Sequence, residues 1–409
     1  MQLRELDSYV RFTVNLFFYA TGGLSLLAIS MATYGWSSGQ LKGFIDQHKF
    51  TDTEHLKESD QDISVPRSLD SKKRTTFALI LQKHRANDTN ARWCSFWSFL
   101  NLFAGFALCE YTYPTPGSLY SLWYLSEVYL AAALVRFFIV FHDCCHGSFF
   151  KSPQANRKLA ILISCFAAVP MEEWKHGHAH HHTHLGDVSV FDDSLTVWFN
   201  RKEYASLPPV LRCAYRIIRD PFIFPGFANA VVFWLLPIVS MRKTFVYRLV
   251  FMLFLYCTGG MTTLINFLVG SSLGGMIGVQ LFHLQHQCNP AIYRVPHSKR
   301  TTLDAGLLGS THLYIPRFLR WMTLGIEYHH IHHASTQVPG YHLQACHEEA
   351  TSIGLLENTG VNFVEGKRAF LSLFHTLFFD QKMETPEKPS PRFCSFEPYQ
   401  SLGLFDSRS

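Results

Sequence analysis

Charged residues are scarce in this 409-residue chain: Asp, Glu, Lys and Arg make up 16% of it, against about 25% in soluble domains. This shortage excludes an ordinary soluble domain. Together with 48% hydrophobic residues and 36 Phe, it indicates a polytopic membrane protein. The formal net charge of +5 suits an anionic membrane surface and is too small to indicate a nucleic-acid partner.

Cysteine motifs that bind zinc are also missing. The ten cysteines include no CxxC pair, and their spacing suggests neither a zinc ribbon nor a disulfide framework. We therefore expect reduced thiols that face the cytosol or lie in the bilayer. The HExxH motif is absent as well, so the sequence gives no support to a zinc metalloprotease.

What the chain does contain is apolar runs long enough to cross a hydrocarbon core of about 30 Å. The runs at 93–113 and 119–143 flank a Pro/Gly break and predict a helical hairpin. A second hairpin is predicted from the runs at 222–241 and 249–283. The sequence thus predicts an all-α membrane protein with four core transmembrane helices in two hairpins.

Three apolar segments complicate the count of four transmembrane helices. Residues 12–36 carry no charge and predict an extra N-terminal span or a targeting segment. Residues 159–171 are too short to span and predict an interfacial or re-entrant helix. The run at 249–283 exceeds the length of one span, so Gly259–Gly260 or Gly274–Gly275 could mark a bend.

The distribution of basic residues predicts the topology. Lys and Arg cluster before residue 93 and again in 151–221, and the positive-inside rule puts both stretches in the cytosol. Both hairpins then start and finish on the cytosolic side. Arg242, Lys243 and Arg248 disagree with this topology, because they follow the first span of the second hairpin and would face the lumen.

Histidine is the residue that the chain uses most distinctively. Residues 176–184 read HGHAHHHTH, six histidines in nine positions, and histidine is the usual transition-metal ligand among side chains. Spacings of i, i+3 and i+4 place side chains on one helical face. Such spacings occur at His142/His146, at His178/His181/His182 and at His329/His332/His333, while His283 and His286 end the last long apolar run.

The topology drawn from charge alone puts all these groups on the cytosolic side, at or just outside the membrane. We therefore predict a cytosolic helical cap that holds a metal centre. His176, His180, His184 and His330 interrupt the spacing and are expected to be surface residues or hydrogen-bond partners of the ligands. A His-rich tract that binds metal loosely is the simpler alternative.

The number of imidazoles bears on the metal. A structural zinc ion takes four ligands and favours cysteine, so eight or nine imidazoles are too many for one zinc. Two iron ions with nitrogen-rich coordination and open positions for oxygen fit the count, and copper and manganese remain alternatives.

At this point the sequence resembles a family. The segments HDCCHGSFFKSPQANRK, WKHGHAHHHTHLGD, FHLQHQ and EYHHIHHASTQVPGYHLQACHEE are similar to those of the membrane fatty acyl desaturases, in particular the methyl-end (delta-12/omega-6 or omega-3) branch. The resemblance covers roughly residues 75–350 and keeps the order and spacing of the histidine boxes. It leaves 1–74 as an N-terminal region and 351–409 as a C-terminal cytosolic tail.

The resemblance implies a non-heme di-iron centre that uses O2 and two electrons to insert a cis double bond into an acyl chain. By that pattern the metal ligands are His142, His146, His178, His181, His182, His286, His329, His332 and His333. The residues His283 and His184 are extra ligands or neighbours of the ligands. Asp143 and Asp187, as well as Asp192 and Asp193, could orient ligand imidazoles.

The substrate and partners also follow from the resemblance. We expect a fatty acyl lipid or acyl-CoA substrate in the membrane, held in an apolar tunnel to which Phe141, Phe149 and Trp174 could contribute. No HPGG heme signature of a fused cytochrome b5 domain is present, and His329 stands where front-end desaturases have Gln. Electrons should therefore come from a separate cytochrome b5 or ferredoxin with its reductase.

Other readings stay open at this stage. An acyl hydroxylase or acetylenase, or a sphingolipid or carotenoid oxygenase, would carry the same ligand set. A His-rich metal transporter would need polar or charged residues along its membrane spans to pass an ion. The predicted spans of this chain carry almost none. For localisation we expect the endoplasmic reticulum, with a plastid or bacterial membrane as the alternative.

Overall fold

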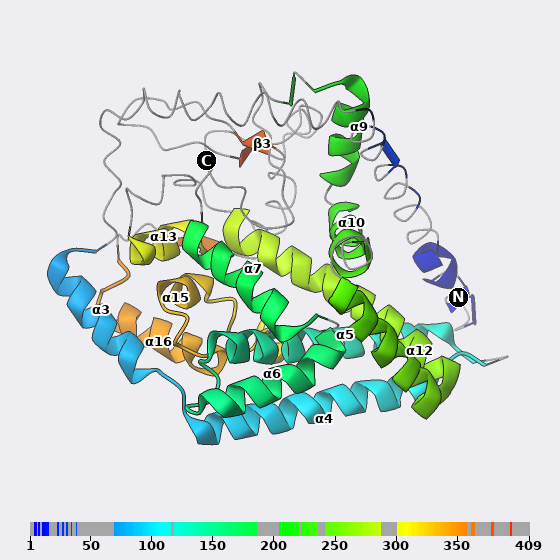
Figure 1. Ribbon diagram of the computed structural model, residues 1–409, viewed down its shortest axis with the longest axis horizontal. Helices are drawn as coiled ribbons and strands as arrows, with labels where there is room; N and C mark the ends of the chain where they lie inside the picture. Colours follow the sequence, from blue (N-terminus) through cyan, green and yellow to red (C-terminus); the bar gives the residue numbers. More distant parts are fainter. Residues whose placement is uncertain are drawn as a thin grey trace.

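The computed structural model describes most of residues 69–185, 204–235, 242–287 and 301–364, with short gaps at 116–117, 168, 206, 221 and 358–360. Scattered positions between 4 and 38 and two short strands, β3 (Phe378–Phe379) and β4 (Phe393–Cys394), complete the described part. Within it the chain is mainly helical (Figure 1), as the sequence predicts. The extra span expected at 12–36 lies largely outside the described residues.

The first predicted hairpin is confirmed as a pair of helices, α4 (Asp88–Thr112) and α5 (Tyr120–His146). Asn87 caps α4, because its side-chain oxygen accepts hydrogen bonds from the backbone N–H groups of Thr89 and Asn90 at 2.9 and 3.2 Å. Gly147 ends α5 in the left-handed conformation at φ 72°, which glycine adopts without a steric penalty. The chain therefore turns sharply just after His146.

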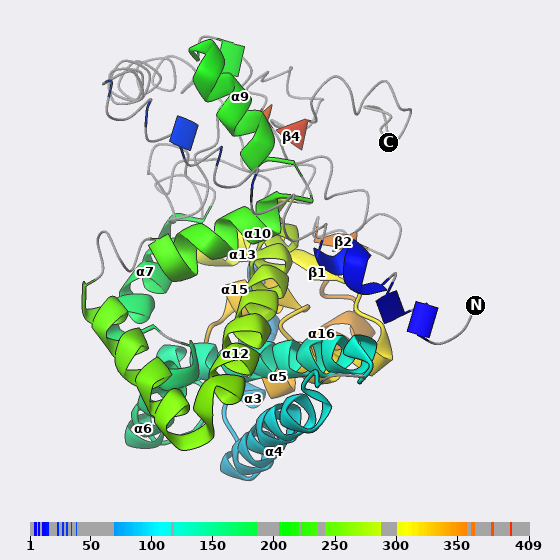
Figure 2. The same ribbon diagram turned by 90° about the vertical axis from the view of Figure 1, so that its right-hand side faces the viewer.

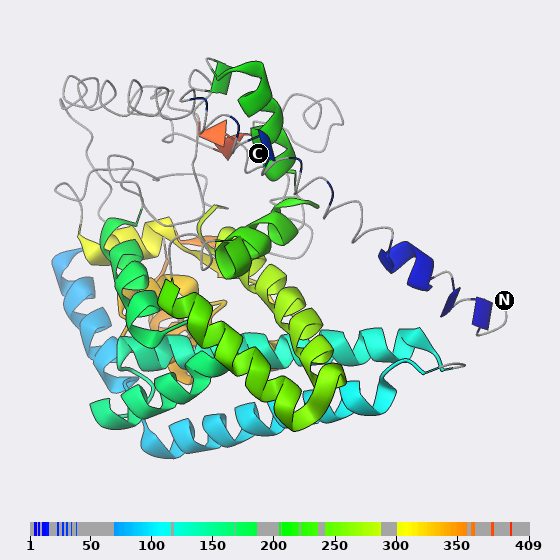
Figure 3. The same ribbon diagram turned by 45° about the vertical axis from the view of Figure 1, so that its right-hand side comes forward.

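The second hairpin differs from the prediction. Residues 222–241 were expected to form one span, but they contain only the short α10 (Phe224–Asn229) and a π-helical turn, η1 (Ala230–Leu235), among the described residues. The hairpin lies instead inside α12 (Arg242–Gln287), which bends at Gly260 with φ 74° and ψ −168°. The two halves meet at this bend in Figures 2 and 3 and measure about 27 and 40 Å at 1.5 Å per residue.

This correction removes the conflict over Arg242, Lys243 and Arg248. Near the start of α12, Thr244 hydrogen-bonds Glu173 of α7 (Met171–His184), the helix that carries the second histidine box. Beside the bend, by contrast, Thr263 donates a hydrogen bond to Glu110 near the C-terminal end of α4, at 2.7 Å. The last turn of α12 carries His286, so both ends of α12 lie on the histidine side, together with the stretches that the charge rule predicts to be cytosolic.

Two helices among the described residues are long and apolar enough to cross a membrane, Tyr120–His146 and Lys243–His286. Of the most apolar 18-residue window, 83% is buried in the first and 17% in the second, so α5 is central and α12 peripheral. α4 also presents apolar side chains outward, including Trp93, Phe96, Trp97 and Phe103. Such surfaces suit contact with lipid.

Leu130 of α5 is wedged between two glycines. A Cβ atom at Gly105 of α4 would lie 3.1 Å from the Leu130 Cα, and one at Gly270 of α12 would lie 2.8 Å from its Cδ2. We expect Gly270→Ala to lower the unfolding free energy by about 1–3 kcal/mol through overpacking. Gly278→Ala is the matched control, because a Cβ there meets nothing within 4 Å. Equal unfolding midpoints for the two variants in detergent would contradict this packing.

Besides Asp143 in the first histidine box, α5 contains two charged residues. Arg136 is buried and donates to the Ser98 hydroxyl at 2.9 Å and to the Trp321 carbonyl, whereas Glu127 is fully buried beside Cys109 and Trp123. No ion pair joins Glu127 to Arg136 in the part of the chain that the structure describes. Arg136 therefore ties α5 to α4 and to the segment before the third histidine box.

Segments before, between and after the two hairpins lie around the histidine end of α5, and we refer to them together as the cap. It comprises α3 (Ser71–Lys83), α7, α13 (Thr302–Gly309), η3 (Arg317–Leu319), α14 (Arg320–Thr323), α15 (His329–Ala334) and α16 (Gly340–Ser352). α6 (Pro153–Ala167) packs on α5, and α9 (Pro209–Ile218) precedes α10. A two-stranded parallel sheet pairs β1 (Thr311–Leu313) with β2 (Asn362–Val364), so ordered pairing continues past residue 350.

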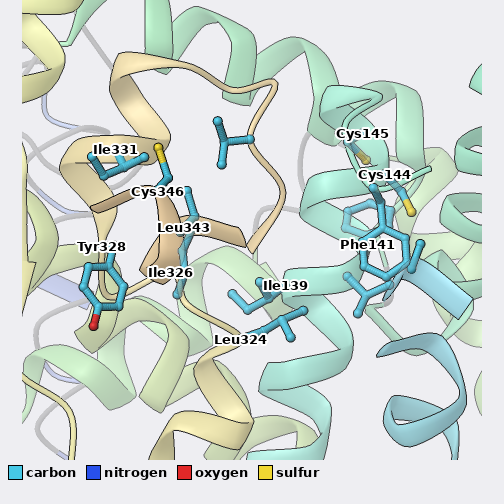
Figure 4. Close-up of a cluster of buried hydrophobic side chains, with 14 of the residues drawn as sticks. Ile139, Phe141, Cys144, Cys145, Leu324, Ile326, Tyr328, Ile331, Leu343 and Cys346 are labelled. Atoms are coloured by element: carbon cyan, nitrogen blue, oxygen red, sulfur yellow. The ribbon is translucent and has the colours of Figure 1, made fainter. Parts of the chain in front are cut away.

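The cap and α5 share one hydrophobic core. Figure 4 shows Ile139 and Phe141 of α5 in the same cluster as Leu324, Leu343 and Ile331 from the cap. Of these, Phe141, Leu343 and Ile331 are completely buried. Since α5 ends in the first histidine box and the cap carries the third, this shared core fixes the two boxes relative to each other.

Candidate metal centre

The histidine boxes converge at the end of α5 and divide into two groups. The first group consists of five histidines from α5, α7 and α15: His142, His146, His178, His182 and His332. Their potential ligand nitrogens all lie within 4.8 Å of one another. The side chains are buried or half-buried, so a metal ion there would be shielded from bulk water.

The second group consists of four buried histidines, His181, His286, His329 and His333. It takes one residue from α7, one from the end of α12 and two from α15. The structure thus brings together all nine histidines that the sequence proposes as ligands. The helix spacing explains the division, because adjacent residues on a helix point about 100° apart. His181 and His182 therefore enter different groups.

The distances between nitrogens fit metal coordination. In the first group the Nε2 atoms of His178 and His142 are 3.0 Å apart, and those of His332 and His182 are 3.1 Å apart. In the second group the Nε2 atoms of His329 and His286 are 3.0 Å apart. With metal–nitrogen bonds of about 2.1 Å, ligands at right angles are about 3.0 Å apart and tetrahedral ones about 3.4 Å. These nitrogens are therefore close enough together to bind a common metal ion.

The electrostatics of the groups favour neutral imidazoles. Burial, reinforced by neighbouring histidines, holds the pKa of His178, His182, His329, His332 and His333 well below the usual histidine value. A neutral imidazole offers a nitrogen lone pair, which is the form that binds a metal. The Nε2 atom of His146 is buried and has no hydrogen-bond partner among the described residues, so its lone pair is available to a metal ion. The set of imidazole nitrogens therefore fits transition-metal ions.

Two contacts fix ring orientation through the other nitrogen. His142 Nδ1 hydrogen-bonds Asp143 Oδ1 at 2.9 Å, and His286 Nδ1 hydrogen-bonds the Gly309 carbonyl at 3.1 Å. A carboxylate or carbonyl oxygen only accepts, so each Nδ1 carries the proton and each Nε2 is left with its lone pair. The other oxygen of Asp143 accepts from the Gly340 N–H at 2.6 Å, which ties the first box to the start of α16.

We expect Asp143→Asn to lower metal affinity of the first group about 10–100-fold, with a matching loss of activity. An amide has one acceptor oxygen, so the variant cannot keep the hydrogen bonds to both His142 and Gly340. Metal titration of the purified chain measures the effect. Ser148→Ala is the control, because Ser148 donates to the Asp143 carbonyl but does not touch an imidazole. Equal affinities of Asp143→Asn and wild type would contradict the role of Asp143.

The other candidate histidines whose side chains the structure describes lie outside both groups. His283 is buried with its ring 4.8 Å from that of Phe224, and His176 and His180 are exposed on α7. His330 is buried and hydrogen-bonds His347 at 3.0 Å, facing away from the metal groups. The side chain of His184 and the residues Asp187, Asp192 and Asp193 lie outside the described part of the chain.

Aromatic rings surround the first group, as the sequence suggests in part. Trp174 stacks on His178 with ring centroids 4.3 Å apart, and the ring centroid of Phe141 lies 5.3 Å from that of Trp174. Phe149 is different, because it packs on Phe150 and Tyr341 in the hydrophobic core and makes no ring contact with a histidine among the described residues. The sequence analysis missed Phe282, which lies 5.0 Å from His181, although its position beside His283 and His286 was a signal.

The sequence analysis also missed a separate polar cluster in the cap. The ring centroids of His312 and His347 lie 4.6 Å apart. The ring centroid of Tyr328 lies 4.4 Å from that of His312 and 5.0 Å from that of His347. His330 joins the cluster through its hydrogen bond to His347. Nothing in the spacing of these residues along the chain indicates that they meet.

Comparison of the sequence with known proteins shows which family it is similar to. The model of the family described as "Fatty acid desaturase" matches residues 118–361, more than half of the chain. A fatty acid desaturase of Bacillus subtilis is 31% identical over 233 residues, which cover 54% of this chain and 66% of that protein. An sn-1 oleoyl-lipid 12-desaturase of Synechocystis is 26% identical over 249 residues, 56% of this chain and 70% of that protein.

Plant relatives are similar over the same part. A chloroplastic omega-6 fatty acid desaturase of Arabidopsis thaliana is 26% identical over 247 residues, covering 55% of this chain and 53% of that protein. The alignments thus span between about half and 70% of the relatives' own length.

Proposed function

The chain belongs to the fatty acid desaturase family, and from this premise we propose that it introduces a cis double bond into an acyl chain embedded in a membrane, at the delta-12/omega-6 or omega-3 position. The observation that carries the proposal is the meeting of nine histidines, from three boxes and the end of α12, in two adjoining groups. The names of relatives as oleoyl-lipid 12-desaturase and omega-6 desaturase support the regiochemistry.

Each group of histidines would hold one iron ion. Iron at these positions supplies the oxidising power to remove hydrogen from an unactivated methylene, which side-chain acids and bases cannot attack. In the overall reaction two hydrogens leave adjacent carbons and O2 is reduced to two waters. Two electrons from an external donor and two protons from solvent complete the balance.

The protein's own residues would orient the ligands and exclude water. Asp143 and the Gly309 carbonyl hold two rings with Nε2 turned inward. Trp174, Phe138 and Phe141 form an apolar wall beside His142 and His178. A wall of this kind suits an acyl chain, whose methylenes offer no polar group to bind.

We further take α4, α5 and the two halves of α12 to cross the bilayer, with the cap in the cytosol or its equivalent. The outward apolar side chains of α4 and α12 support this arrangement. The bacterial and chloroplast relatives favour a bacterial or plastid membrane, and none of those named here supports the endoplasmic reticulum that the sequence led us to expect. A separate ferredoxin or cytochrome b5 would supply the electrons, and the acyl carrier would be a glycerolipid or CoA.

Fatty-acid methyl ester profiling tests the proposal. The chain would be expressed in yeast that makes only saturated and monounsaturated acids, with His178→Ala and His332→Ala as inactive controls. We expect a new diunsaturated acid that is absent from both variants. A hydroxylated acid would instead favour the acyl hydroxylase with the same ligand set. No new acid from a well-expressed, iron-loaded chain supplied with ferredoxin would contradict the proposal.

A further inference from the structure

α13 contacts two members of the four-histidine group. The carbonyl of Gly309, its last residue, accepts a hydrogen bond from His286 Nδ1 at 3.1 Å. Gly306, one turn earlier, packs on the backbone of His333 so closely that a Cβ atom would lie 2.7 Å from the His333 carbonyl carbon. The position of α13 therefore sets both the tautomer of His286 and the position of α15 beside it.

α13 is in turn held by an ion pair from a distant part of the chain. Both oxygens of Asp304 accept hydrogen bonds from the Arg74 guanidinium of α3, at 2.8 and 2.7 Å. Thr301 donates to Asp304 at 2.6 Å, and Arg74 also donates to the Leu69 carbonyl at 2.8 Å. Asp304 is only 4% exposed, whereas the Arg74 side chain is 24% exposed, so loss of Arg74 would leave a buried carboxylate without its charged partner.

The other end of α3 is attached to a different support. Lys83 and His84 both contact Glu349 of α16 at 2.8 Å, and Lys83 and Glu349 are more exposed than Arg74 and Asp304. α16 leads to the five-histidine group through the hydrogen bond from Gly340 to Asp143. Figure 1 shows α3 running along the edge of the cap from α13 to α16. Each end of α3 thus meets the element that supports one histidine group.

We propose that Arg74 and Asp304 are positioning residues for the four-histidine group alone. Their ion pair fixes α13, and α13 fixes His286 and His333 in the geometry that binds a metal ion. Neither residue touches a ligand itself. The proposal rests on the proposed function, because it takes both histidine groups to be iron sites. It goes further by making one of the two sites depend on a contact with the segment before the first hairpin.

Metal counting on the full chain in detergent tests the proposal. Wild type, Asp304→Asn, Arg74→Gln and Glu349→Gln would be loaded anaerobically with 57Fe(II), and bound iron would be measured per chain. We expect Asp304→Asn and Arg74→Gln to retain about one iron ion where wild type holds two. Glu349→Gln, which breaks the contact at the other end of α3, should retain both ions. Mössbauer spectra should show that the same one of two ferrous signals is lost in both variants.

A charge swap and hydrogen exchange separate positioning from a general loss of structure. Arg74→Asp combined with Asp304→Arg should restore the second iron ion, and the single variants should show faster amide exchange in 302–309 but not in 340–352. Two iron ions in a folded Asp304→Asn chain, or none, would overturn the proposal. If Asp304→Asn does not fold, Arg74→Gln decides, because its side chain is partly exposed. Fewer than two iron ions in wild type would instead refute the proposed function.

Discussion

Replacing either His181 or His182 with alanine is expected to reduce turnover by at least about 10³-fold, well beyond the 10–100-fold effect of losing a hydrogen-bond partner of a ligand. The two residues are consecutive in α7, yet the structure assigns them to different groups. His182 Nε2 lies 3.0 Å from that of His178, and His181 Nε2 lies 3.2 Å from that of His286. Each substitution therefore removes an imidazole from a different candidate metal site.

The two variants should differ in which site they impair. His182→Ala leaves four imidazoles in the first group, whereas His181→Ala leaves three in the second. We expect His181→Ala to lose its iron ion more completely, because fewer ligands remain. The measurement is fatty-acid profiling for turnover together with iron content per chain.

His180→Ala is the matched control for this pair. His180 precedes His181 in the same helix but is exposed and belongs to neither group. It should keep its turnover and both iron ions. If all three alanine variants lost activity equally, the histidines of α7 would be acting as a bulk metal-binding tract, and the division into two groups would be wrong.

The candidate site was predictable to a large extent because its information is local. The i, i+3, i+4 spacing in 178–182 and 329–333 depends only on helix geometry, and it selects the residues that the structure brings together. The same spacing cannot say that His181 joins His286 while His182 joins His332, because that depends on how α7, α12 and α15 pack. Nor could it place Asp304 beside Arg74, which is 230 positions away.

The fold was predicted less well where apolar length was the only signal. Residues 222–241 are as apolar as a span, but the described part of them forms a short helix and a π-helical turn. The run that follows bends at Gly260 and supplies both halves of a hairpin. Arg242, Lys243 and Arg248 disagreed with the topology predicted from the sequence, and this disagreement was the sequence evidence for the observed arrangement. Basic residues indicate which side of the membrane a segment faces, whereas the length of an apolar run does not show where the chain turns.

The stability of the folded chain is also expected to depend strongly on pH. This dependence arises in the cap cluster formed by His312, His330, His347 and Tyr328. Burial lowers the pKa of His312 to about 3 and that of His347 to about 4. In the unfolded chain both have a pKa of about 6.5. At higher pH both states are neutral and the two residues contribute nothing to pH dependence. As the pH falls below about 6.5, the unfolded chain gains protons that the folded chain does not, so stability decreases.

We expect these two histidines to cost the metal-free chain about 4 kcal/mol of unfolding free energy between pH 8 and pH 5. Each contributes a slope of about 1.4 kcal/mol per pH unit once the pH is well below 6.5, and the decrease continues until the folded pKa values are reached. Chemical unfolding in detergent at a series of pH values measures it. The metal groups contain buried histidines of their own, so the wild-type slope will exceed this amount.

The double variant His312→Gln, His347→Gln isolates the contribution of the cap cluster. Glutamine keeps a polar side chain of similar length but does not titrate, so the variant should lose about 4 kcal/mol of the pH dependence and retain the rest. An unchanged slope would mean that the two imidazoles are hydrated and protonate freely in the folded state. A reduced slope would show that the cap excludes water at His347, 17 positions beyond His330, and that the buried interior around the third box extends beyond the candidate metal ligands.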